Sequence, residues 1–434
     1  MKIAASRELT VAGILRTAKA DKGLDIVGVI DAITPTVAAE LAAAVAQGTL
    51  VPLPGGGLRG PDGLVLLLGG EIELLVAGQR VHFLAFVPGL SELRGLAQRL
   101  RPHLTNPTLS TQRAHGVDPD TLCGWADASG GACWPAHAFT PHRGLYGCAV
   151  RSVRDELGPA LAARFPAMEL GLSADTAMAD RISELRAVTF LSSSDAHSLG
   201  TIGRESNALT VRRPDWEEVA LALRRNGGCA VIANYGLDPA LGKYHRTSCL
   251  ACGARADVAP PVLICPRCGS PRVVRGVADR MEMIADLPAP SHPAHRPPYI
   301  HQIPLRMLPG VGPAMVARLL REIGPEHHVL HRADIAEIAA VAGAPVADAV
   351  RRMRADQTLI EAGGGGRYGR VQRSREGARG VGSPEGEPAG GRTDRPRTEP
   401  RHAPDPGRPR PGDGRAGGRP GRPLGAGDPA HGPE

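Results

Sequence analysis

Asp195 and His197 stand two residues apart in the segment FLSSSDAHSLG, which covers residues 190–200. The apolar run that precedes them predicts a short β-strand. Residues i and i+2 of an extended segment point to the same face, so this carboxylate and this imidazole can reach a common point. The carboxyl end of a strand is a usual position for a catalytic or metal-binding pair in barrels and open α/β sheets. An isolated Asp-x-His in a loop is, however, more often a hydrogen-bonded turn.

Other residues of metal-binding type occur at the ends of further predicted strands. Asp31 follows the run IVGVI, Glu71 follows two glycines in VLLLGGEIELLV, and His82 lies in VHFLAFVP. His137 follows the run GGACWPA. Each of them alone is more often an ordinary core or surface residue, but their recurrence within one domain favours a shared site. The predicted metal ligands are Asp31, Glu71, His82, His137, Asp195 and His197.

Carboxylate and imidazole ligands suit Zn, Mn or Fe in a hydrolytic site. Two or three such divalent ions generate a hydroxide and neutralise phosphate oxygens. Asp195 and His197 are the residues that we predict to be catalytic.

Short strands and helices alternate through the first half of the chain. Apolar spacing predicts helices over 8–22, 36–48 and 214–227, and strands over 65–76, 81–88 and 167–175. Such alternation indicates an α/β domain with a mainly parallel sheet.

Four cysteines form the strongest signal in the sequence. They are spaced Cys-x2-Cys-x12-Cys-x2-Cys, and the residues are Cys249, Cys252, Cys265 and Cys268. Four thiolates close a tetrahedral zinc site and leave no position for water, so we predict a structural zinc ribbon rather than disulfides. The remaining cysteines have no such spacing.

The segment LPGVGP at 308–313 joins two helical patterns. Glycines there let backbone N–H groups approach a phosphate, and the following helix N-terminus adds positive potential. A glycine-bearing turn without a ligand is the alternative. A second glycine run at 361–371 either meets phosphate or a base face, or serves as a flexible hinge. The predicted DNA-binding residues are Arg306, Gly310, Gly312, Arg318, Arg367 and Arg370.

The composition sets broad limits. The 434 residues carry a net charge of +7, almost all of the basic charge is arginine, and aromatic residues make up 3% of the chain. This charge permits a polyanionic partner. No apolar run approaches the roughly 20 residues that span a bilayer, so we expect no membrane partner. The two Cys-x-x-Cys pairs suit a metal in a reducing compartment, which favours a cytoplasmic location. The Gly/Pro/Arg-rich segment 372–434 is expected to be disordered.

Several segments together resemble the endonuclease Q-like family of the PHP (polymerase and histidinol phosphatase) superfamily. They are ASRELT, GLDIVGVIDA, LLGGEIELL, PAHAFTPH, LGLSADT and SDAHSLGTIGRE. The resemblance implies a distorted (β/α)7 barrel with a multi-metal site, followed by a zinc ribbon and a small helical domain with a helix-hairpin-helix motif. The expected limits are 1–235 for the barrel, 243–285 for the ribbon and 286–371 for the DNA-binding region.

This chain departs from the family pattern in two places. The family places an Asp-x-His-x-His strand upstream of the equivalent of ASRELT, so we expect a barrel lacking its first strand and two histidine ligands. Where the family often has a histidine two residues after the aspartate, this chain has Ile33.

The resemblance implies a metal-dependent endonuclease that hydrolyses phosphodiester bonds at damaged, in particular deaminated, bases during DNA repair. Its expected partner is a damaged duplex. Two alternatives remain: a small-molecule phosphoesterase of the histidinol-phosphatase type, and a catalytically impaired DNA-binding remnant.

Overall fold

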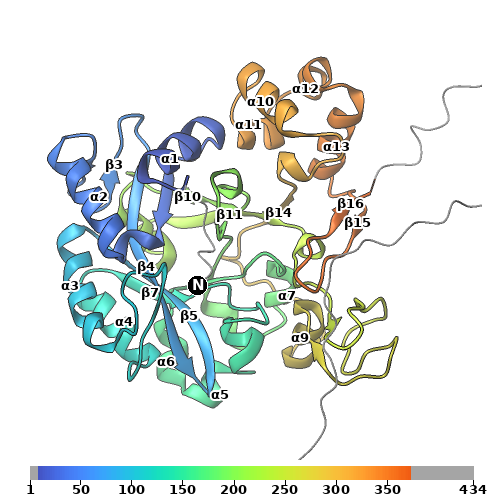
Figure 1. The fold of residues 1–434 in the computed structure, drawn as a ribbon, viewed down its shortest axis with the longest axis horizontal. Coiled ribbons are helices and arrows are strands. Elements are labelled where there is room, and N and C mark those ends of the chain that lie inside the picture. The colour runs from blue at the N-terminus through green and yellow to red at the C-terminus, as the bar shows by residue number, and fades with distance from the viewer. Residues whose placement is uncertain (1–7, 373–434) are drawn as a thin grey trace, which may run out of the picture. The chain divides into compact units, whose positions relative to one another are not determined.

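The computed structural model describes residues 8–372 of the chain (Figure 1), and the predicted disordered tail therefore lies outside the described residues apart from Gln372. A long antiparallel hairpin dominates the first half. It consists of β4 (Val65–Val76) and β5 (Gln79–Val87), which pair from Leu68↔Val87 to Val76↔Gln79. The connection between them is only two residues long, Ala77 and Gly78, and both have positive φ.

Five further strands complete a seven-stranded sheet around this hairpin. β1 (Ile26–Val29) and β6 (Thr111–Arg113) pair with β4 in parallel, and β7 (Ala132–Pro135) pairs with β5 antiparallel. β2 (Val51–Pro52) and β3 (Leu58–Arg59) extend the sheet beyond β4. The prediction of a mainly parallel sheet is wrong here, because a two-residue connection joins only antiparallel strands.

The remaining strands form smaller sheets. β8 (Ala167–Glu169) and β9 (Thr189–Leu191) are a parallel pair. A three-stranded sheet has the order β10 (Ser206–Thr210), β11 (Ala230–Leu237), β14 (Tyr299–Gln302). β12 (Ser248–Cys249) pairs with β13 (Val273–Val274), and β15 (Ile360–Glu361) pairs with β16 (Arg370–Val371). Within residues 8–372 the strands do not close into a barrel, because β1 pairs with β4 alone and β10 with β11 alone.

The helices are mostly short. Those before the ribbon are α1 (Val11–Arg16), α2 (Pro35–Ala46), α3 (Leu90–Leu100), α4 (Pro119–Ala128), α5 (Val153–Leu157), α6 (Pro159–Arg164), α7 (Thr176–Ala179) and α8 (Trp216–Arg224). Those after it are α9 (Val277–Ile284), α10 (Pro313–Glu322), α11 (Glu326–His331), α12 (Ile335–Ala342) and α13 (Ala344–Arg354). The fold is thus mixed α/β, and the helices expected near 8–22, 36–48 and 214–227 are present with shorter limits.

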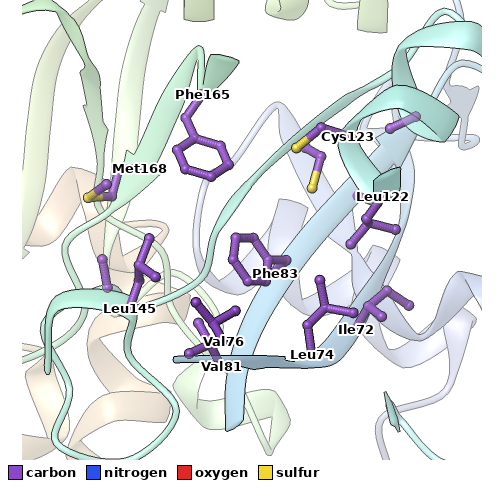
Figure 2. Close-up of a cluster of buried hydrophobic side chains, with 14 of the residues drawn as sticks. Ile72, Leu74, Val76, Val81, Phe83, Leu122, Cys123, Leu145, Phe165 and Met168 are labelled. Atoms are coloured by element: carbon purple, nitrogen blue, oxygen red, sulfur yellow. The ribbon is translucent and has the colours of Figure 1, made fainter. Parts of the chain in front are cut away.

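The two faces of the β4–β5 hairpin pack into different cores. Alternate residues of a strand point to opposite faces. Ile72 and Leu74 of β4 and Phe83 of β5 point into a large core with Leu122 and Phe165, as Figure 2 shows. The residues between them belong to the other face, where Leu67, Leu84, Phe86, Trp134 and Trp216 form a second apolar cluster.

Helices α10–α13 have a separate core, which includes Leu319, Val329, Ile338 and Val350. The segment before LPGVGP is a single 3-10 turn (Leu305–Met307) rather than the predicted helix. The four residues between Pro304 and Pro309 are too few for a full helix.

Two elements near the predicted domain limits contact the first half of the chain. Val277, Met281 and Ile284 of α9 pack in the large core of the hairpin, and β14 pairs with β11. No helix of the described residues has the length and hydropathy that crossing a membrane requires.

Candidate active site

A cavity of about 1240 Å³ lies on the inner face of the β4–β5 hairpin. Apolar side chains line one part of it, among them Leu67, Phe86 and Trp134, and polar side chains line another. The polar part contains residues from five segments: Asp31, Glu71, His137, Glu169, Asp195 and His197. Most of the metal ligands predicted from the sequence therefore face one cavity.

Strand alternation places Glu71, Glu73 and His82 on this inner face. Glu71 and Glu73 follow Leu67 at even spacing along β4, and His82 precedes Leu84 and Phe86 by the same spacing along β5. In the ladder His82 lies opposite Glu73, so its ring stands beside both carboxylates. The sequence suggested strand ends for Glu71 and His82, but both lie well inside long strands.

Glu71, His82 and His137 converge. One ligand atom from each lies within 4.8 Å of the others. His82 Nδ1 is 3.2 Å from Glu71 Oε1, and His137 Nε2 is 3.9 Å from Glu71 Oε2. The three side chains are largely buried. A carboxylate with two imidazoles is a ligand set that holds a divalent transition metal.

The charges of Glu71, His82 and His137 strongly affect one another's pKa values. Burial raises the pKa of Glu71, but His82, His137 and Thr111 outweigh it and lower the pKa to about 2. Burial lowers the pKa of His82, but Glu71 and Glu73 outweigh it and raise the pKa to about 9. For His137 burial dominates and lowers the pKa. The His82 imidazole thus lies in a strongly anionic environment.

Glu73 is the neighbour of this cluster rather than a member of it. Arg113 Nε lies 2.6 Å from its Oε1 and Arg143 Nε lies 2.9 Å from its Oε2, and Arg80 also pairs with it. The basic side chains neutralise Glu73, whereas among residues 8–372 the partners of Glu71 are the imidazoles of His82 and His137 and the Thr111 hydroxyl. Of the two carboxylates, Glu71 is therefore the better placed to bind a cation.

His137 and Asp195 share an unusual backbone conformation. Their φ angles are +30° and +43°, in a region that side-chain-bearing residues rarely adopt. Such residues cluster at functional sites, where surrounding contacts hold them. The backbone N–H of His137 donates to Glu169 Oε2 at 3.2 Å.

Asp195 and His197 do not join the three-residue cluster. Asp195 is close enough to His137 to affect its pKa, but His197 is half exposed at 52% of its side-chain surface. His197 Nδ1 lies 3.0 Å from the backbone oxygen of Asp195. Asp31, in the 3-10 turn Ile30–Ile33 after β1, accepts a hydrogen bond from the Ser110 hydroxyl. Asp31, Asp195 and His197 thus line the same cavity but lie outside the cluster of Glu71, His82 and His137.

Three buried glutamates were missed from the sequence: Glu73, Glu169 and Glu205. Burial raises the pKa of Glu169 to about 7 and that of Glu205 to about 8. Glu205 Oε2 is buried without a hydrogen-bond partner in the described residues. The available signal was a glutamate inside an otherwise apolar strand, as in AMELG.

The four cysteines of the predicted ribbon come together as expected. Their sulfur atoms lie within 4.8 Å of one another, with Cys249 and Cys268 Sγ 3.7 Å apart and Cys252 and Cys265 Sγ 3.6 Å apart. The backbone N–H of Ala251 points at Cys249 Sγ from 3.3 Å. This arrangement fits a structural zinc ion.

The predicted DNA-binding residues lie in two separate segments, one around the start of α10 and one in the β15–β16 hairpin. Gly310 has φ +85° with open space around it, and Gly312 caps α10, whereas Arg318 pairs with Glu322 of its own helix. Arg306 lies against Gly200 of the Asp195 loop. Arg367 and Arg370 are exposed in the β15–β16 hairpin.

Comparison with known protein sequences gives two relatives. The uncharacterized protein YqxK of Bacillus subtilis is 40% identical over 375 residues, which cover 86% of this chain and 95% of that protein. The uncharacterized protein MJ0043 of Methanocaldococcus jannaschii is 39% identical over 224 residues, but these cover only 47% of this chain and 28% of that protein. No protein-family model matches the sequence.

Solved structures give the more informative likeness. The lesion-specific endonuclease PfuEndoQ of Pyrococcus furiosus has a TM-score of 0.75 and 33% identity, covering 87% of this chain and 94% of its own. Endonuclease Q in complex with a 27-mer duplex that carries an abasic lesion at the active site has the same TM-score and identity. Because identity and coverage are high for both sequence and structure, this chain belongs to the endonuclease Q-like family.

Proposed function

We propose that this chain is a metal-dependent endonuclease that hydrolyses a phosphodiester bond at a damaged base in DNA. The observation that carries the proposal is the convergence of Glu71, His82 and His137 in a cavity, in a chain similar to a lesion-specific endonuclease. Deaminated bases are the proposed lesions, with the abasic lesion of the related complex as a second. A damaged base is cheaper to unstack, which offers a physical basis for selectivity.

The donor set fits a divalent metal. Both ring nitrogens of His82 are buried without an aligned hydrogen bond in the described residues, although carboxylates lie within ion-pair distance of them. Glu71 and Glu73 favour a proton on this ring by raising its pKa to about 9, so a divalent ion would bind the ring by displacing that proton. The low pKa of Glu71 keeps its carboxylate ionised. When bound, Zn, Mn or Fe would polarise a phosphoryl oxygen and lower the pKa of water.

We propose that Asp195 and Asp31 add carboxylates to this set, and that His197 acts at the rim. Asp195 lines the cavity near His137, and His197 is exposed on the same loop, where an incoming phosphodiester would pass. Glu169 braces the backbone of His137 through its N–H. These residues would orient the phosphate and the imidazoles, and bound divalent ions would supply the Lewis acid.

We propose that the site holds two or three divalent ions, because the carboxylates of Asp31, Glu71 and Asp195 and the imidazole of His137 line one cavity.

DNA is the proposed partner, held by three surfaces. These are the cysteine ribbon, the Gly310–Gly312 turn before α10, and the glycine-rich hairpin with Arg367 and Arg370. Backbone N–H groups at such turns contact phosphate and carry no base sequence information.

The test compares two substrates. Purified chain is incubated with a duplex that carries one deaminated base and, separately, with a soluble phosphate monoester, each with added Mn or Zn. Cleavage of the duplex alone supports the proposal. Hydrolysis of the monoester alone would identify a small-molecule phosphoesterase, and DNA binding without either reaction would identify a catalytically impaired binding protein.

A further inference from the structure

The glycine-rich hairpin is fixed to the body of the protein. Gly363 N–H donates to Ala240 O at 2.7 Å, Gly369 N–H to Leu241 O at 2.9 Å, and Gly366 N–H to Lys243 O at 3.0 Å. A Cβ atom at Gly363 would lie 2.4 Å from Gly242 O, so only glycine allows this approach. The hairpin therefore holds its side chains in defined positions rather than acting as a hinge.

Tyr368 is the side chain that this hairpin directs toward the Asp195 loop. Its hydroxyl accepts a hydrogen bond from Arg204 Nη1 at 2.7 Å, and the guanidinium lies 5.9 Å from the ring centroid. Tyr368 remains 38% exposed, so part of its surface is accessible to a ligand.

Arg204 uses its other nitrogens on the loop itself. Nε donates to Ser194 O at 2.6 Å and Nη2 donates to Asp195 O at 2.8 Å. The planar guanidinium thus fixes two successive carbonyl groups. These are the carbonyls on both sides of the Asp195 Cα, whose φ of +43° is unfavourable for a residue with a Cβ atom.

We infer that Arg204 and Tyr368 form a positioning pair that holds Asp195 in its left-handed conformation. Neither residue touches the reacting atoms. The Tyr368 hydroxyl fixes the guanidinium, and the guanidinium fixes the loop that carries Asp195 and His197. Because the exposed ring of Tyr368 stands beside Arg367, a DNA strand that contacts the hairpin would also stabilise this loop. The inference rests on the proposed function for its catalytic consequence, but its structural part does not.

The test uses Tyr368→Phe and Arg204→Lys in the full chain. Tyr368→Phe keeps the ring and removes only the hydroxyl, and Tyr244→Phe serves as the matched control because it removes a tyrosine hydroxyl from the neighbouring segment. Amide hydrogen exchange of residues 193–197 is measured without DNA. We expect about three- to tenfold faster exchange in both test variants, as for loss of one net hydrogen bond, and no change in the control.

Steady-state cleavage of a damaged duplex gives the second readout. Tyr368→Phe should lower kcat about three- to tenfold at nearly unchanged KM, whereas Arg367→Ala, on the same hairpin, should raise KM instead. Unchanged exchange and unchanged kcat in Tyr368→Phe would overturn the inference. If the wild-type chain cleaves no duplex, the proposed function fails, and the exchange measurement still decides whether Tyr368 positions Asp195.

Discussion

His82 lies directly opposite Glu73 in the ladder between β4 and β5, and its Nε2 atom is 3.5 Å from Glu73 Oε2. Cross-strand neighbours of this kind fix one another's orientation. Glu73 is in turn held by Arg113 and Arg143. Arg113 and Arg143 therefore hold the Glu73 carboxylate in place, and Glu73 in turn orients the His82 ring beside Glu71.

Glu73→Gln should weaken metal binding in the cavity about 10- to 100-fold, because it removes the charge that orients His82. Competition with a chelator measures the affinity. Glu337→Gln on the exposed surface of α12 is the control and should leave the affinity unchanged. Equal affinities for both variants would show that Glu73 has no orienting role.

Glu71→Gln and His82→Gln remove proposed ligands directly. Each should lose the cavity metal and lower cleavage by at least about 100-fold, a larger effect than that of Glu73→Gln. Elemental analysis after gel filtration counts the metal per chain. Retention of full metal content in both variants would exclude this cluster as the site.

Asp195→Asn combined with His197→Ala should abolish hydrolysis while leaving affinity for DNA nearly unchanged. The pair lines the cavity, whereas binding is assigned to the ribbon, the α10 turn and the hairpin. Fluorescence anisotropy with a labelled duplex gives the affinity. Normal cleavage by the double variant would remove both residues from the proposed site.

Cys265→Ser should lose the structural zinc and unfold the ribbon locally, since structural zinc contributes folding free energy directly. DNA binding should weaken, but the cavity metal should remain. Cys148→Ser is the control, because Cys148 lies outside the four-cysteine cluster. Zinc content that is the same in the two variants would contradict the assignment.

Stability should fall as pH rises from about 6.5 to 9 because of His301. Burial lowers its pKa, but Asp175 and Asp356, at 3.2 and 3.0 Å from its ring nitrogens, raise it to about 9 from 6.5. A raised pKa in the folded state stabilises the protein fully below pH 6.5, and the contribution is lost through pH 9. Urea unfolding across this range measures the slope. His301→Gln should reduce the slope, although His82, whose pKa is also raised to about 9, still contributes to it. An unchanged slope would exclude the His301 ion pairs as a source.

Some of these features followed from the sequence and others did not. The cysteine cluster did, because its spacing alone defines a tetrahedral site. Glu71 and His82 were predicted at strand ends but lie inside β4 and β5, since the two-residue turn at Ala77 and Gly78 was not recognised as a hairpin. His137 follows the end of β7, as predicted. Glu169 was missed because burial, not residue type, distinguishes it. The separation of His197 from the cluster depends on the Asp195 backbone, which tertiary contacts with Arg204 fix.

The most direct test of the account is incision of a duplex that carries one abasic site or one deaminated base, by chain stripped with a chelator and then reloaded with metal. We predict no incision by the stripped chain, incision restored once metal binds beyond the ribbon zinc, no cutting of the undamaged duplex, and no recovery for reloaded Glu71→Gln. Incision by the stripped chain, or equal rates for reloaded wild type and Glu71→Gln, would contradict the assignment of catalysis to the Glu71, His82 and His137 cluster.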